Sequence, residues 1–219
     1  MDYQFLTKTT LFRGITPEEA RKMMHCLDGE ERLFSRGETV CRAGDAVAQM
    51  GLVLSGSVNV EHDDLWGNKS IINHVSSGQI FAEAYACVPG ELLVVNVVAA
   101  EACEILFLNV GRILQICSGA CGFHTKLVRN LLSVMAQRNL ELSQRILHTS
   151  PKTIRGRLIS YLSYQAAKSG TSQVTVPFNR QQLADYLGVD RSALSNELGK
   201  MQRDGILEVN RSTFRLLGI

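Results

Sequence analysis

Hydrophobic and polar positions follow a different spacing in each of three successive stretches of the chain. In the first stretch, glycines at 37, 44, 51, 56, 67 and 78 separate short segments rich in Val, Leu and Ile. This spacing predicts many short strands and a small barrel or jelly roll, preceded by a short helix that begins at Thr16-Pro17-Glu18-Glu19. The best strand candidates are 38–41, 50–54, 57–60, 70–74, 92–99 and 102–108. The interior of such a barrel commonly holds a small ligand, although a fully packed core is the alternative.

The second stretch, from His124 to Thr149, contains neither Pro nor Gly and predicts one long helix. An apolar stripe roughly 27 Å long follows it at 1.5 Å per residue, with a gap in the heptad at Arg138-Asn139. The stripe consists of Val128, Leu131, Met135, Leu142 and Ile146. It favours a parallel dimer coil over a helix that packs only on its own barrel. Ser150-Pro151 then predicts a hinge, because the residue before proline is pushed out of the helical region.

The third stretch predicts two short helices around a tight turn. Asn179, with Gln182 three residues later, has the pattern of a helix start, and Gly188 ends that helix. Asp190 can cap the second helix, whose Leu194, Leu198 and Met201 recur at the i, i+4, i+7 spacing until Gly205. A strand at 174–176 and a hairpin around residues 210–212 complete the order of a winged helix-turn-helix.

The outward face of the second helix carries donors and acceptors. At about 100° per residue, Ser192, Ser195 and Asn196 project opposite the apolar stripe, and Arg191 lies at the helix N-terminus, where such helices meet base edges. Arg211, at the hairpin tip, is expected to lie near the phosphate backbone. This pattern predicts a DNA-reading unit; the alternative is a helical hairpin with a solvated polar side.

Charge is divided unequally between the two halves of the chain. Residues 1–122 hold 9 Lys and Arg against 15 Asp and Glu, a net charge of −6, whereas residues 123–219 hold 14 against 6, a net charge of +8. A domain of that sign attracts a polyanion, and phosphate contacts would supply most of its affinity for DNA. The division also favours two domains.

Composition sets limits on location and covalent structure. The sequence contains no transmembrane segment, and its N-terminus lacks the apolar core of a signal peptide, so we expect a cytoplasmic protein. The 6 cysteines are too scattered for a disulfide scaffold, and most are expected to be thiols.

The order of barrel, long helix and winged helix resembles the Crp/Fnr family of bacterial transcription regulators over nearly the whole chain. The motifs that carry the resemblance are GETVCRAGD, VLSGSVNV, SGQIFAEA, TIRGRLISYL and RQQLADYLGVDRSALSNELGKMQRDGIL, of which the last is highly specific. The expected fold is α+β, with a jelly-roll or double-stranded β-helix sensor barrel similar to a cyclic-nucleotide-binding domain at 1–122. A dimerisation helix at 123–149 and a winged helix-turn-helix at 150–219 follow.

Membership of that family implies a homodimer that binds a palindromic DNA operator, with RNA polymerase as a further partner and allosteric control through the barrel. Carried over by position, Asn179 and Gln181 would touch phosphate, and Arg191, Ser192, Ser195 and Asn196 would face bases. The best-known member has Arg, Glu and a second Arg at three of these positions. Because only Arg191 is retained, a different operator is expected.

The expected effector depends on residues that are missing from the barrel. In cyclic-nucleotide-binding members of the family a Glu holds the ribose 2′-hydroxyl and an Arg-Ser pair clamps the cyclic phosphate. Glu83 matches the Glu, but the clamp positions are Leu93 and Val94, which offer neither charge nor hydroxyl. A buried phosphate without its clamp would cost several kcal/mol. On the long helix, the Thr-Ser pair that reads the purine aligns with Leu142 and Ser143. Cyclic AMP is therefore not expected to bind.

Three interpretations of the sensor remain. An apolar or aromatic small molecule could bind among Tyr85, Leu93, Val95 and Leu142, with Glu83 as the polar anchor, and this is the favoured one. The second is a closed pocket in which Glu83 caps backbone N–H groups. The third is a metal, haem or thiol sensor.

The sequence identifies no cofactor, but one metal-ligand pattern is present. Cys117, Cys121 and His124 are spaced i, i+4, i+7, which on one helix would make a partial zinc or iron site. Gly119 and Gly122 weaken such a helix, and two apolar cysteines in a loop are the favoured interpretation. An Fnr-type iron–sulfur site is short of ligands, since residues 1–40 contain only Cys26. Haem ligation by His62, His74 or Cys87 has no spacing in its favour.

Functions of other classes have weaker support. A cupin-type metalloenzyme needs two or three His and a carboxylate on neighbouring strands. His25, His124 and His148 lie on predicted helices, which leaves only His62 and His74. No arrangement typical of a catalytic triad, a phosphate-binding Gly loop or paired carboxylates is present, so an enzyme is not expected. A non-DNA-binding interaction module is the stronger rival.

Overall fold

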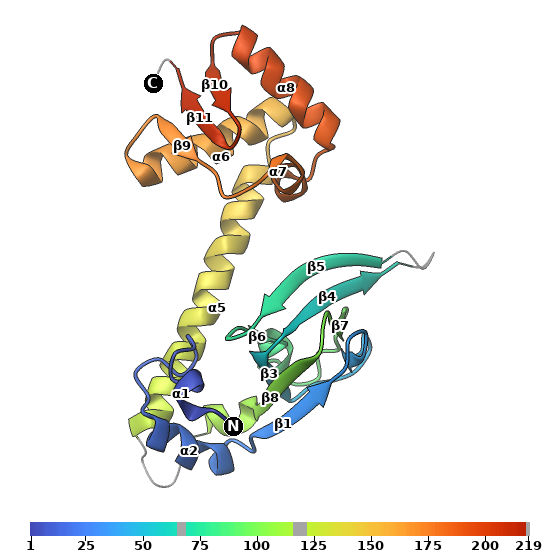
Figure 1. The fold of residues 1–219 in the computed structure, drawn as a ribbon, viewed down its shortest axis with the longest axis vertical. Coiled ribbons are helices and arrows are strands. Elements are labelled where there is room, and N and C mark those ends of the chain that lie inside the picture. The colour runs from blue at the N-terminus through green and yellow to red at the C-terminus, as the bar shows by residue number, and fades with distance from the viewer. Residues whose placement is uncertain (65–68, 116–121, 218–219) are drawn as a thin grey trace. The chain divides into compact units, whose positions relative to one another are not determined.

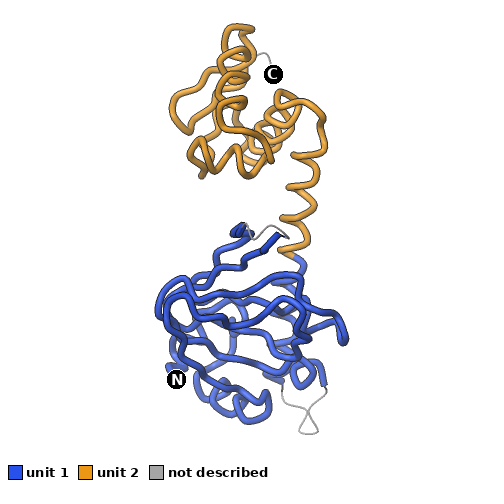
Figure 2. Tube along the Cα trace, turned by 90° about the vertical axis from the view of Figure 1, so that its right-hand side faces the viewer, with its two compact units in different colours: residues 1–136 blue, residues 137–219 orange. Residues whose placement is uncertain are grey.

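The protein has two compact units joined by one continuous helix. The computed structural model describes residues 1–64, 69–115 and 122–217 (Figure 1). The units comprise residues 1–136 and 137–219, drawn in blue and orange in Figure 2. The division falls inside the long helix α5 (Gly122–Thr149), so each half of that helix belongs to a different unit. Within the described ranges, no helix combines the length and apolar character that a membrane crossing needs.

The first unit consists of two four-stranded antiparallel sheets and short helices. One sheet has the order β1-β8-β3-β6 and the other β2-β7-β4-β5. The strands are β1 (Glu30–Phe34), β2 (Thr39–Cys41), β3 (Gln49–Ser55), β4 (Ser57–Asp63), β5 (Lys69–Ser76), β6 (Ile80–Phe81), β7 (Asn96–Ala99) and β8 (Cys103–Asn109). The helices of this unit are α1 (Tyr3–Leu6), α2 (Pro17–Cys26), α3 (Glu83–Ala86), α4 (Val110–Leu114) and the first half of α5.

A core between the two sheets holds the barrel together. Val53, Ile105 and Phe107 from the first sheet meet Val58 and Val97 from the second in one buried cluster. Phe107 contacts the rings of Phe34 and Phe81, each edge-on with centroids 6.3 Å away. Gly51 leaves room for this packing, because a Cβ on it would lie 2.1 Å from the Phe81 ring. The sheets therefore pack face to face, as in a jelly roll.

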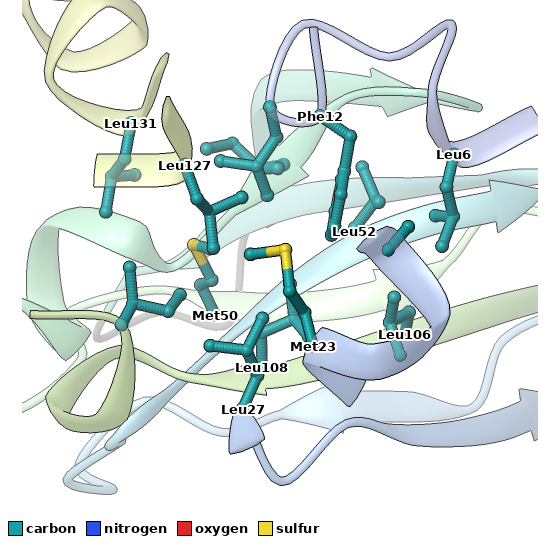
Figure 3. Close-up of a cluster of buried hydrophobic side chains, with 14 of the residues drawn as sticks. Leu6, Phe12, Met23, Leu27, Met50, Leu52, Leu106, Leu108, Leu127 and Leu131 are labelled. Atoms are coloured by element: carbon teal, nitrogen blue, oxygen red, sulfur yellow. The ribbon is translucent and has the colours of Figure 1, made fainter. Parts of the chain in front are cut away.

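A second core covers the outer face of the sheet that contains β3 and β8. Met50, Leu52, Leu106 and Leu108 on these strands pack against α1, α2 and α5 (Figure 3). Because this sheet is buried on both faces, β3 and β8 are almost continuously apolar instead of alternating. The first half of α5 takes part through Leu127 and Leu131, which are fully buried or nearly so.

The second unit is built around one compact core. It contains the second half of α5, α6 (Ile154–Ser169), β9 (Gln173–Thr175), α7 (Arg180–Leu187), α8 (Arg191–Arg203), β10 (Leu207–Asn210) and β11 (Thr213–Leu216). The three strands form an antiparallel sheet in the order β10-β11-β9. Leu183 of α7 and Leu194, Leu198 and Met201 of α8 are buried against Phe214 of β11. Helix, strand, two helices and a hairpin are the elements of a winged helix-turn-helix.

Most expected elements are present, and the differences have local causes. The capping box at Thr16 starts α2 as expected, and α5 ends at Thr149 as expected. The expected strand at 92–99 is wrong in its first half. The backbone of Leu93 instead forms hydrogen bonds with the backbone of Gly44 and Asp45 in a loop, so that regular strand pairing begins only at Asn96. The strands β1 and β6 were not expected, because Glu30–Phe34 is mostly polar and Ile80–Phe81 has only two residues.

Candidate nucleic-acid interface

We call residues 150–219 the recognition unit. Its helices α7 and α8 begin and end at the residues that the sequence predicts. The Asn179 side chain accepts from the Gln182 backbone N–H at 2.9 Å, and the Gln182 side chain accepts from the Asn179 N–H at 2.9 Å. Gly188 ends α7 with a φ of 63°. Asp190 caps α8 by accepting from the Ala193 N–H at 2.9 Å. The two caps and the glycine turn thus define where the helices begin and end, and both helices pack on one shared core.

The polar face of α8 is open to solvent. Arg191, Ser192, Ser195 and Asn196 are all exposed, while the apolar stripe of the same helix is buried. Gly199 continues that face one turn after Ser195. A Cβ placed on Gly199 would have only the Arg203 side chain within 4 Å among the described residues. The first turns of α8 can therefore approach a surface closely and present hydrogen-bonding side chains to it.

Local hydrogen bonds order several of these side chains. The Ser192 hydroxyl donates to Asp190 at 2.5 Å, and the Ser195 hydroxyl donates to the Arg191 carbonyl at 2.9 Å. The pKa of Asp190 is lowered, first by the bond from Ser192 and then by the Ala193 N–H. On α7, the Gln181 amide donates to Asp185 at 2.8 Å. Each hydroxyl keeps an acceptor lone pair for another partner.

The hairpin β10–β11 forms a wing whose tip is strained. Arg211 occupies the turn with a φ of 54°, a left-handed conformation that is costly for a side chain with a Cβ. Arg180 donates to the Arg211 carbonyl at 3.2 Å and lies over the Phe214 ring at 5.2 Å. Burial lowers the pKa of Arg180. Arg180 thus links the start of α7 to the wing.

A groove of about 490 Å³ lies between the wing tip and the start of α7. Its lining consists of Val176, Pro177, Phe178, Asn179, Arg180, Arg211 and Ser212. Two guanidinium groups and the exposed N-cap of a helix therefore border one concave surface. Helix N-termini and arginines both favour phosphate oxygens.

Arg155 and Arg157 support the recognition unit, and neither was assigned a role from the sequence. Arg155 pairs with Glu197 at 2.7 Å and with Asp204 at 2.7 Å, which joins α6 to α8. Glu197 first and Asp204 second raise the pKa of Arg155. Arg157 donates to the carbonyls of Leu187 at 2.9 Å and Gly188 at 3.0 Å. In the sequence they are indistinguishable from phosphate-binding arginines.

The predicted dimer stripe on α5 divides into two parts. Leu131 is 2% exposed, and Val128 and Met135 pack against the core of the first unit. Leu131 therefore faces the barrel of its own chain, whereas Val128 and Met135 are only half-buried, and their place in a dimer seam stays a prediction. Leu142 and Ile146 are 62% and 65% exposed.

The predicted pocket residues of the barrel differ in burial. Glu83 and Leu93 are buried, and Tyr85 and Val95 are half-buried. Val94 is 62% exposed, so its expected place in the pocket is wrong. The backbone hydrogen bonds of Leu93 with the loop at residues 44–45 direct the Leu93 side chain inward and the Val94 side chain outward. Leu142 belongs to the other unit, and its place in this pocket stays a prediction.

The predicted metal-ligand pattern falls partly outside the described residues. Cys117 and Cys121 lie outside them, whereas His124 is buried on α5 beside Phe123, with ring centroids 5.8 Å apart. Among the residues that the structure describes, no group of three or more metal-ligating side chains comes together. Burial raises the pKa of Cys41 to about 11 and also raises the pKa of Cys87 and Cys103, so these three are poor thiolate sensors.

Two family profiles match the chain in the order of its domains. The profile described as "Cyclic nucleotide-binding domain" matches residues 31–119, and "Crp-like helix-turn-helix domain" matches residues 156–218. The CRP-like protein Clp of Xanthomonas euvesicatoria is 26% identical over 96% of this chain and 95% of its own length. The chain belongs to the Crp/Fnr family of transcriptional regulators. Its fold class and its DNA-binding helix-turn-helix, predicted from the sequence, are thereby confirmed.

Several solved structures match nearly the whole chain in fold. The catabolite activator protein of Thermus thermophilus is 21% identical with a TM-score of 0.52, over 95% of this chain and 93% of its own. The c-di-GMP responsive global regulator CLP of Xanthomonas campestris is 19% identical with a TM-score of 0.54, over 91% and 98%. CprK complexed with OCPA is 14% identical with a TM-score of 0.62, over 91% and 89%. These likenesses show a common fold.

The strained wing tip gives a test of the geometry. Replacing Arg211 with Gly should raise the free energy of unfolding by about 0.5–1 kcal/mol, since glycine adopts the left-handed conformation without strain. Arg215→Gly is the matched control: it removes the same charge from the extended strand β11 and should lower stability by about 0.5–1 kcal/mol. Urea unfolding of both variants measures the difference. Equal destabilisation by the two changes would contradict the strain at Arg211.

Proposed function

We propose that the chain acts as a homodimeric regulator that binds a palindromic operator through α8 and responds to an effector in its barrel. The observation that carries the proposal is the exposed polar face of α8, capped by Asp190 and supported from below by buried Leu194, Leu198 and Met201. Such a face at a helix N-terminus fits the major groove of B-DNA.

Contacts with DNA divide into positioning and reading. Asn179, Gln181 and Arg211, together with the groove beside the wing, are suited to phosphate oxygens. Arg191, Ser192, Ser195 and Asn196 are suited to base edges. Arginine pairs well with guanine O6 and N7, and asparagine with adenine, so we expect at least one G·C pair in each half-site.

Arg191→Ala tests the assignment of the reading face. The variant should lose about 1–3 kcal/mol of specific binding, because a bidentate guanine contact disappears, while its binding to random duplex DNA falls little. Arg203→Ala is the matched control, since it removes an equally exposed cation from the last turn of α8. It should leave the ratio of specific to random binding unchanged. Competition binding measures this ratio, and an unchanged ratio in Arg191→Ala would sink the assignment.

The exposed side of α5 supports association with a second copy. Leu132, Ala136, Asn139, Ser143 and Ile146 follow each other at the 4-3-4-3 spacing of a heptad seam, and Leu132 and Ile146 are 67% and 65% exposed. This seam is rotated relative to the predicted stripe, away from the side of α5 that packs on the barrel. Two-fold dimers of this kind match a palindromic operator with half-sites about one turn of DNA apart.

Ile146→Glu tests the dimer. Two glutamates brought together across a two-fold seam repel and lose apolar burial, so the variant should sediment largely as a monomer. Leu33→Glu is the control, because Leu33 is 79% exposed on β1. Sedimentation velocity on both variants decides the question: a dimeric Ile146→Glu would contradict this seam.

The proposed effector is an apolar or aromatic small molecule. Leu93, which stands where a phosphate clamp would be needed, is buried and carries no charge. Half-buried Tyr85 and Val95 add apolar surface, and buried Glu83 offers a carboxylate to a ligand donor. The similarity to Clp makes c-di-GMP the rival effector, but its phosphates would meet the same lack of a cation at Leu93.

Thermal unfolding with added compounds distinguishes these effectors. Neither cyclic AMP nor c-di-GMP at about 1 mM should raise the Tm, whereas phenols and aromatic amines, which bring a donor for Glu83, should do so. Leu93→Ala should abolish the shift, and Val94→Ala, an exposed neighbour, should retain it. A rise in Tm with either nucleotide would contradict the proposed effector.

A further inference from the structure

His148 is a buried histidine in the last turn of α5, surrounded by aromatic rings. It is 1% exposed. Its ring centroid lies 5.3 Å from Tyr161 and 5.2 Å from Tyr164, both on α6, and 5.9 Å from Tyr186 on α7. Phe178 extends the cluster by stacking on Tyr186 at 5.1 Å. One side chain of the long helix thus contacts both helices that follow it.

A single hydrogen bond orients this ring. The Nδ1 atom of His148 lies 2.9 Å from the Tyr186 hydroxyl. Its Nε2 atom is buried, with no hydrogen-bond partner among the described residues. A protonated imidazole would therefore hold a charged N–H without an acceptor, which is costly in a buried site. Burial lowers the pKa of His148 accordingly, so the ring is neutral near pH 7.

Two arginines fix the same junction beside His148. Arg145, one turn earlier on α5, donates to the Asp185 carbonyl at 3.4 Å and lies over the Tyr186 ring at 5.9 Å. Arg157 donates to the Pro151 carbonyl at 2.9 Å as well as to the end of α7. Helix α5 does end just before Pro151, where a hinge is predicted. However, Arg145 before this break and Arg157 after it both form hydrogen bonds that span the junction. The end of α5 and the start of the recognition unit are therefore held as one body.

We propose that His148 is a positioning residue, which through Tyr186 fixes the direction of the recognition unit on the end of the long helix and so sets the spacing between two half-sites. The proposal rests on the proposed dimeric function. No base or phosphate contact is assigned to His148. Its effect reaches DNA only through α7, whose C-terminal end leads directly into the turn before α8.

Spacing selectivity is the property that such a residue controls. One added base pair moves the second half-site by about 3.4 Å and rotates it by about 35°. Two recognition units that are held firmly cannot follow this displacement, whereas loosely held units can. Binding to one isolated half-site needs no fixed direction and should not depend on His148.

The test compares three ring-preserving variants. Tyr186→Phe removes the hydroxyl that bonds His148, and His148→Phe removes the imidazole and keeps a ring. Tyr164→Phe is the matched control, because it removes a hydroxyl from the same cluster without removing the bond to His148. The probes are a palindromic duplex selected from a random library, the same duplex with one base pair inserted between its half-sites, and a duplex with one half-site.

The expected result is a loss of selectivity rather than of binding. Tyr186→Phe and His148→Phe should each reduce the discrimination between the two palindromes by about three- to tenfold, the effect of one lost side-chain hydrogen bond. Their affinity for the single half-site should equal that of the wild type. Tyr164→Phe should behave as wild type with all three probes.

A pH profile separates this role from simple stability. The groups that face His148 are Arg145 on α5, Tyr161 and Tyr164 on α6, and Tyr186 on α7, where Asp185 directs its carboxylate to Gln181. Burial lowers the pKa of His148 from 6.5. The packing of the neutral His148 ring against α6 and α7 is therefore fully stabilising above that pH, and this stabilisation is lost as the pH falls below it. Spacing selectivity should therefore decline from about pH 7 to 5.5 in the wild type and stay constant in His148→Phe.

Each outcome has a distinct meaning. Wild-type selectivity in both Tyr186→Phe and His148→Phe would overturn the positioning role, and so would an equal loss of affinity for the single half-site. If the wild type selects no palindrome, the proposed dimeric function fails instead, and His148 has no half-sites to space.

Discussion

One helix is shared by two hydrophobic cores, and the other features depend on this arrangement. The first half of α5 is buried through Leu127 and Leu131 in the core of the barrel unit. Its last turn is buried through His148 in the aromatic cluster of the recognition unit. On α5, Leu132 and Ile146 stay exposed, and they are the apolar positions of the seam proposed for the dimer.

The two units differ in charge and in how their charged side chains are used. The basic excess lies in the unit that carries α8 and the wing, and the proposed function assigns affinity to phosphate contacts there and sequence selectivity to the exposed polar side chains of α8. Several arginines of this unit are committed to the protein itself. Arg155 and Arg157 hold the helices together, and Arg180 holds the wing, so the cations available to DNA are fewer than the sequence suggests.

Local signals made the recognition unit predictable from its sequence. The caps at Asn179 and Asp190 and the glycine at 188 act over three or four residues, and the structure has each of them where the pattern indicates. The barrel strands were less predictable. β1 is polar, and β6 is too short for any period, since both are defined by pairing with distant strands. The dimer stripe on α5 was only partly predictable for a related reason. Periodicity identified an apolar side of α5, but it could not tell that the barrel of the same chain covers half of that side.

Selection of the wild-type protein on a library of random duplexes, with and without cyclic AMP, tests the central claim most directly. We expect enrichment of a palindrome with a G·C pair in each half-site, unchanged by cyclic AMP, because the proposed reading face includes Arg191 and the proposed pocket has Leu93 at the position of the phosphate clamp. Enrichment of a non-palindromic site would contradict a dimeric operator-binding regulator. Enrichment only with cyclic AMP would contradict the proposed apolar effector.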